Sequence, residues 1–107
     1  MVRPAAALHG EGVPDDVYEL LATEIARDKL AARGISPVEV EQVPRNLHRI
    51  VRDPHEGTEP GRRRLLVGET DGGRVLTLVI ERTVEPTTWL VVTGWSATDA
   101  ERKLLDR

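Results

Sequence analysis

The sequence predicts one α+β domain in which two N-terminal helices precede an antiparallel sheet of three to four strands and a C-terminal helix closes the chain. Apolar residues recur at three- and four-residue intervals early in the chain, which is typical of an amphipathic helix. Runs rich in β-branched residues flank an Asp-Gly-Gly turn in the second half. Serine and threonine capping boxes indicate two further helix starts.

The first third of the chain contains a leader and one long helical pattern. Residues 1–13 have no periodicity, so we expect a flexible leader before a single domain over 14–107. Apolar residues face one side over residues 15–33, and acidic residues crowd the first turn, where they complement the helix dipole. Gly34 then marks the end of this predicted helix.

A second helix is predicted to start at a strong local signal. Ser36 can cap the helix, Pro37 suits its first position, and Glu39 completes a capping box. Pro44 lacks an amide hydrogen, so the helix should end or kink near Val43. Residues 45–51 should then form a short turn or an edge strand, before a surface loop over 53–61.

The second half of the chain carries the clearest strand signals. Residues 75–80 are apolar on both faces apart from Thr77, so this strand should be central and at least partly covered on each side. Thr98 and Glu101 form another capping box, which opens a last helix to about residue 105. The predicted strands span residues 63–70, 74–82 and 88–94.

Composition excludes several classes of function. The 107 residues contain no cysteine, which rules out disulfides and thiolate chemistry and fits a cytoplasmic protein. No apolar stretch is long enough for a signal peptide or a membrane span. The three histidines lack metal-ligand spacing, and no glycine loop for a nucleotide is present, so we expect no metal and no cofactor.

Charge is distributed unevenly although the formal net charge is only −3. Acidic residues dominate up to residue 44, whereas arginines cluster from Arg45 to Arg64. Arginine suits bidentate contacts with phosphate, although a solvated surface explains such a cluster equally well.

Metal-free ribonuclease chemistry is the one catalytic chemistry for which suitable residue types are present. It needs proton-transfer groups together with cations that stabilise the phosphate. Candidate catalytic residues lie on or beside the predicted strands: Arg64, Arg74, Arg82, Glu81 and His48.

The order and spacing of several motifs resemble those of the BrnT-type toxins, which belong to the RelE-like group of bacterial ribonuclease toxins. The matching stretches are Lys29 with Gly34-Ile35-Ser36 and Glu39-Val40-Glu41, then residues 64–77, then Val92-Thr93, Ala97 and Glu101-Arg102. The resemblance implies a RelE-like fold, RNA cleavage that stalls translation, and a small antitoxin protein as partner.

One further set of residues is expected to bind the RNA substrate. Trp95 stands where these toxins tend to carry an arginine, and it either stacks on a base or belongs to the core. The candidate substrate-binding residues are Lys29, Arg63, Thr93 and Trp95. The sequence therefore predicts an RNA-cleaving toxin; the alternative is a non-catalytic protein-binding or regulatory module of the same fold.

Overall fold

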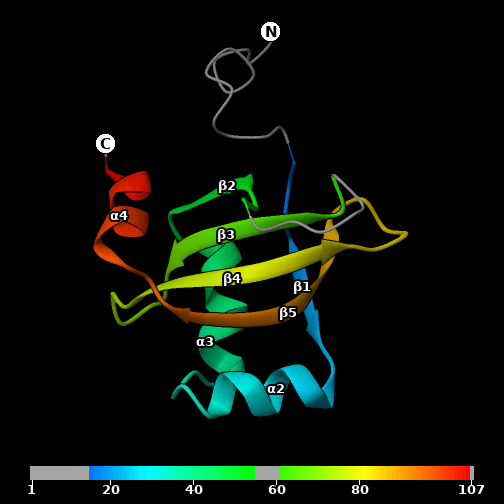
Figure 1. The fold of residues 1–107 in the computed structure, drawn as a ribbon, viewed down its shortest axis with the longest axis horizontal. Helices are drawn as coiled ribbons and strands as arrows, with labels where there is room; N and C mark the ends of the chain where they lie inside the picture. The colour runs from blue at the N-terminus through cyan, green and yellow to red at the C-terminus, as the bar shows by residue number, and fades with distance from the viewer. Residues whose placement is uncertain (1–14, 55–60, 107) are drawn as a thin grey trace, which may run out of the picture.

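A computed structural model describes residues 15–54 and 61–106 of the chain. It is an α+β fold with a five-stranded mixed sheet in the order β1-β5-β4-β3-β2 (Figure 1). The predicted class is confirmed, whereas the predicted leader lies outside the described residues. The elements are β1 (Glu19–Ala22), α2 (Glu24–Ala31), α3 (Pro37–Gln42), β2 (His48–Arg52), β3 (Arg63–Glu69), β4 (Val75–Arg82), β5 (Thr88–Ser96) and α4 (Asp99–Arg102).

The long first helix was predicted wrongly over its N-terminal half. Residues 19–22 form β1, which pairs in parallel with β5 and places Leu20 beside Trp89. Only the part from Glu24 is helical, because the Thr23 side chain accepts a hydrogen bond from the Ala26 amide and caps α2 there. The sheet therefore has five strands rather than three to four, and a strand precedes the two helices.

The local signals further along the chain are confirmed. Ser36 and Glu39 form the capping box of α3, which ends at Gln42 before a 3-10 turn over Val43–Arg45. Residues 48–52 form the edge strand β2. A tight turn joins β3 to β4 and contains Gly73 at φ 88°, a backbone conformation that glycine adopts without strain. The last helix begins after Thr98 but is short, and a 3-10 turn over Lys103–Leu105 follows it.

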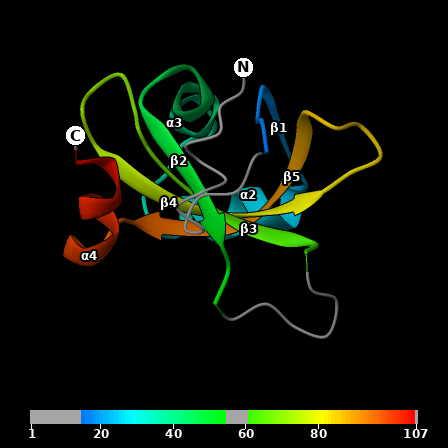
Figure 2. The ribbon, with the colours of Figure 1, turned by 90° about the horizontal axis from the view of Figure 1, so that it is seen from above.

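The sheet has apolar side chains packed on both of its faces. Figure 2 shows α3 on one side of β3, β4 and β5. On one face, α2 and α3 enclose the main core, in which Leu66, Leu78 and Trp89 are almost fully buried. We call the other side the outer face. Among the helical elements of the described residues, α4 and the 3-10 turn after it pack at one end of the outer face. There, Leu105 belongs to the same small apolar cluster as Val67. Strand alternation places these residues on the outer face: Arg49, Val51, Arg63, Leu65, Val67, Val75, Thr77, Val79, Glu81, Leu90, Thr93 and Trp95.

The central position of β4 explains its composition. Residues 75–80 are all buried, as predicted, because β3 and β5 flank the strand and side chains pack on both faces.

Candidate functional site

Arg64 and Arg82 meet at one end of the sheet, where both bind the same carboxylate. Arg64 donates from Nε to Asp15 Oδ2 at 3.0 Å, and Arg82 donates from Nη2 to Asp15 Oδ1 at 3.0 Å. Only 8% of the Arg64 side chain and 13% of the Asp15 side chain are exposed. The Arg82 guanidinium also lies 4.9 Å from the centre of the Trp89 ring. These contacts attach the segment before β1 to the sheet.

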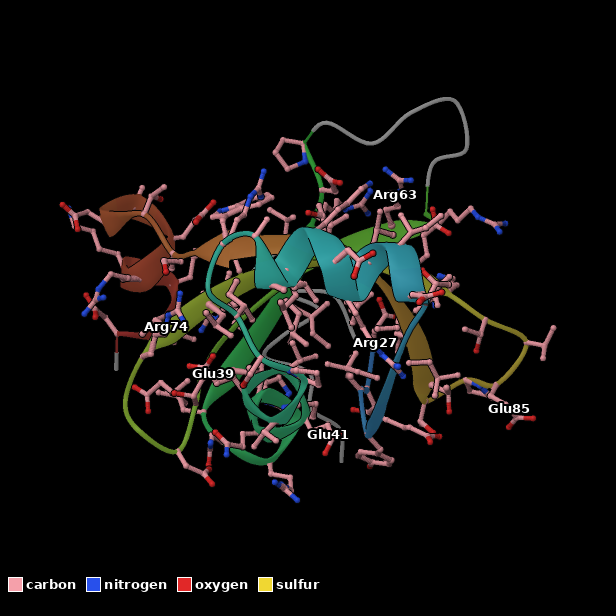
Figure 3. All side chains as sticks on the ribbon, turned by 90° about the horizontal axis from the view of Figure 1, so that it is seen from below. Arg27, Glu39, Glu41, Arg63, Arg74 and Glu85 are labelled. Atoms are coloured by element: carbon pink, nitrogen blue, oxygen red, sulfur yellow. The ribbon has the colours of Figure 1, made fainter. Side chains whose placement is uncertain are left out.

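Arg74 lies at the opposite end of β4 from Arg82. At about 3.3 Å per residue the two are separated by roughly 26 Å, so no single active site contains both. Arg74 joins the β3–β4 turn to the start of α3, because Nη1 donates to the Gly34 carbonyl at 2.8 Å and to Glu39 Oε2 at 3.2 Å. Its Nη2 donates to Ser96 Oγ at 2.8 Å. In Figure 3, Arg74 and Glu39 lie close to each other.

The two predicted proton-transfer groups lie on different faces of the sheet. Glu81 is on the outer face and forms an ion pair with Arg63, whose Nε lies 2.8 Å from Glu81 Oε2. His48 begins β2 on the helix-covered side, opposite Gly68, with Nδ1 2.9 Å from the Asn46 carbonyl. Of the predicted catalytic residues, Arg64 and Arg82 are therefore brought together, whereas Arg74, Glu81 and His48 lie apart from them and from each other. Their catalytic role stays a prediction.

Three of the four predicted substrate-binding residues do share a surface. Thr93 and Trp95 project from β5 on the outer face, and Arg63 projects from β3 on the same side. Lys29 is exposed on α2 in the helical layer, away from this surface.

Trp95 is held by a polar network that the sequence did not reveal. Its Nε1 donates to Glu101 Oε1 at 3.0 Å, and the fully buried Thr77 hydroxyl donates to the same oxygen at 2.8 Å. Burial raises the pKa of Glu101, but hydrogen bonds from Thr98, Thr77 and Trp95 outweigh it and leave this pKa below its usual range. A carboxylate on α4 thus fixes the indole orientation on β5. The one signal of this network in the sequence was Thr77, which carries the lone hydroxyl within the apolar run of β4.

Arginines that form no ion pair with another described residue lie on β2 and in the 3-10 turn before it. We call Arg45, Arg49 and Arg52 the basic edge; all three are exposed. No ion pair with another described residue is found for any of them. Residues 45–54 contain three arginines and one acid, whereas residues 15–44, which form the helical layer and β1, contain seven acids and three bases. The chain is therefore basic along residues 45–54 and mainly acidic along residues 15–44.

Two other site types find no support in the described part of the chain. No group of three or more histidine or acidic residues there is placed to hold a metal ion. None of the helices in residues 15–54 and 61–106 is long and apolar enough to cross a membrane.

No protein-family model matches this chain, and no match is found among curated proteins.

Proposed function

We propose that this domain binds single-stranded RNA through the outer face of the sheet and the basic edge beside it. The observation that carries the proposal is the shared position of Arg63, Thr93 and Trp95 on one face, next to the basic edge, whose arginines form no ion pair with another described residue. Positive charge that follows the phosphate backbone, combined with an aromatic ring for a base, is the usual basis of sequence-tolerant binding to single strands.

Trp95 is the proposed stacking residue. It is half-buried, and its indole nitrogen is satisfied by Glu101, so the ring is oriented before any ligand arrives. Stacking of a base on such a ring contributes about 1 to 3 kcal/mol in proteins that bind single strands.

The basic edge supplies the electrostatic part of the proposal. Neutralising phosphates on a single strand gives a slope of about −0.7 per contact in a plot of log K against log salt concentration, so three arginines predict a slope of about −2. Affinity should then fall about 15-fold between about 50 and 200 mM salt.

The proposal does not include cleavage by the predicted arginines. Arg64 and Arg82 bind Asp15, and Arg74 binds the α3 start, so these side chains have structural partners. Of the predicted proton-transfer groups within the described residues, only Glu81 lies on the outer face, where it pairs with Arg63. The toxin role implied by the BrnT-type resemblance would need further groups on this face.

Fluorescence anisotropy with a labelled oligouridine strand tests the proposal. A double substitution of Arg49→Gln and Arg52→Gln should weaken binding and reduce the salt slope by about 1.4. The matched control, Arg27→Gln with Lys29→Gln, makes the same change in charge on the helical layer and should leave the slope unchanged. Absence of binding by the wild type, or equal losses in both double variants, would overturn the proposal.

Gel electrophoresis of the same RNA separates binding from cleavage. We expect the strand to stay intact at saturating protein. Cleavage that survives replacement of both Glu81 and His48 would show that proton-transfer groups other than the predicted ones act on the RNA.

A further inference from the structure

A wide cleft lies where α4 and the 3-10 turn after it meet one end of the sheet, and we call it the α4 cleft. In Figure 1, α4 is beside this end of the sheet. The cleft has a volume of about 530 Å³, within the range of roughly 300 to 1,000 Å³ that is usual for small-molecule sites. The sheet and the helical segment each contribute three lining residues: Leu47, Glu69 and Val75 from the first, Arg102, Leu105 and Asp106 from the second.

The sheet side of the α4 cleft is one row of neighbouring residues. Glu69 ends β3 and pairs with Val75, which begins β4. The Glu69 amide also donates to the Leu47 carbonyl at 3.1 Å, just before β2. Val75 is buried and Leu47 is half-buried, so an apolar floor lies beside the Glu69 carboxylate. Strand pairing therefore fixes this side of the cleft.

The three charged side chains of the α4 cleft do not neutralise one another. Arg102 and Asp106 are four residues apart, a spacing at which side chains on a helix can meet. Neither of them, nor Glu69, forms an ion pair with another described residue. One cation and two carboxylates thus surround the apolar floor with their charges unpaired within the described part of the chain.

We infer that the α4 cleft binds a free α-amino acid with an aliphatic side chain. The planar guanidinium of Arg102 suits the α-carboxylate, which can accept two parallel N–H bonds from it. The α-ammonium group has three N–H donors and no acceptor, so it needs carboxylates such as those of Glu69 and Asp106.

Ligands of other charge types use only part of this set. An anion would be repelled by the two carboxylates, and a cation would be repelled by Arg102. A zwitterion places a group of opposite sign at each charged side chain of the cleft. None of the lining residues is among those assigned to RNA contact, so the cleft can bind its ligand whether or not the sheet binds RNA.

The aliphatic side chain of the ligand follows from the floor. Leu47, Val75 and Leu105 form an apolar surface that glycine would leave uncovered. Complete burial of a leucine side chain corresponds to roughly 10- to 100-fold in affinity, and partial cover in an open cleft to about 5- to 10-fold.

Amide chemical-shift titration of the 15N-labelled full chain at neutral pH tests the inference with four small ligands. L-leucine carries every group that the cleft is inferred to bind, whereas N-acetyl-L-leucine lacks the ammonium group, L-leucinamide lacks the carboxylate and glycine lacks the apolar side chain. We expect saturable shifts at the lining residues with L-leucine. Glycine should bind at least about fivefold more weakly, and the other two about two- to fivefold more weakly, as for exposed ion pairs.

Two results would overturn the inference. The first is the absence of a saturable shift with L-leucine. The second is binding of glycine, N-acetyl-L-leucine or L-leucinamide with the same affinity as L-leucine, because the cleft would then not recognise the group that this ligand lacks.

A matched pair of variants locates the contact. Arg102→Gln should weaken L-leucine about two- to fivefold but should not weaken L-leucinamide, which has no carboxylate to lose its partner. Lys103→Gln removes the same charge from the next residue, which is exposed and outside the set that lines the cleft, so it should bind L-leucine like the wild type. Equal effects of the two substitutions on L-leucine affinity would refute the role of Arg102.

Discussion

Replacing Asp15 with asparagine should destabilise the protein strongly, because this carboxylate is shared by two arginines. Arg64 is only 7% exposed, and Asp15 is its ion-pair partner at 3.0 Å. Breaking a buried ion pair by removing one partner typically costs about 3 to 5 kcal/mol. Arg64 keeps a hydrogen bond to the Arg63 carbonyl, and Arg82 is partly exposed, so we expect a loss near the lower end, about 3 kcal/mol.

Urea unfolding followed by tryptophan fluorescence measures this loss. With an m-value of about 1 to 3 kcal/mol/M, the midpoint should fall by roughly 1 to 3 M urea. Asp16→Asn is the matched control, since the Asp16 side chain is exposed and, within the described residues, the bond that Asp16 makes to the Trp89 indole comes from its backbone carbonyl. The control should change stability by less than about 0.5 kcal/mol. Equal midpoints for the two variants would refute the structural role of Asp15.

Two further predictions concern stability. Because the pKa of Glu101 is lowered in the folded state, its contribution is complete above the unfolded value of about 4.3 and is lost as pH falls through the folded value. The stability difference between wild type and Glu101→Gln should therefore shrink on acidification, in urea midpoints measured at successive pH values. Gly94→Ala should cost about 1 to 3 kcal/mol, since the new Cβ would lie 2.6 Å from Leu78 Cδ2. Gly72→Ala, whose Cβ would meet nothing closer than 4.0 Å, is the control for thermal melting.

Each of these has a result that would contradict it. A constant stability difference across pH would mean that Glu101 does not titrate with a lowered pKa. A melting temperature of the Gly94 variant equal to that of the Gly72 variant would mean that β4 and β5 separate easily to admit a methyl group.

Short-range signals in the sequence predicted much of the fold. The capping boxes at Ser36 and Thr98, the interruption at Pro44 and the turn before Arg74 each act within a few residues, so their outcome does not depend on distant partners. The prediction that residues 75–80 form a central strand was also confirmed, because an apolar run on both faces requires cover from both sides.

The candidate site was only partly predictable, because only some of its features depend on short-range signals. Thr93, Trp95 and Arg63 share a face because strand alternation alone sets the direction of their side chains. The engagement of Arg64 and Arg82 was not predictable, since their partner Asp15 is about fifty residues earlier in the chain than Arg64. Arginines that suit phosphate suit a carboxylate of their own protein equally well.

By itself, therefore, the sequence determined the α+β class, most helix and strand positions and the absence of thiol chemistry. Only the tertiary structure decided that residues 19–22 form a strand, because their apolar pattern fits a helix until β5 supplies a parallel neighbour from the other end of the chain. It also decided which of the described arginines are held by carboxylates of the protein itself. Ion pairs form between residues that folding brings together, and no local pattern contains that information.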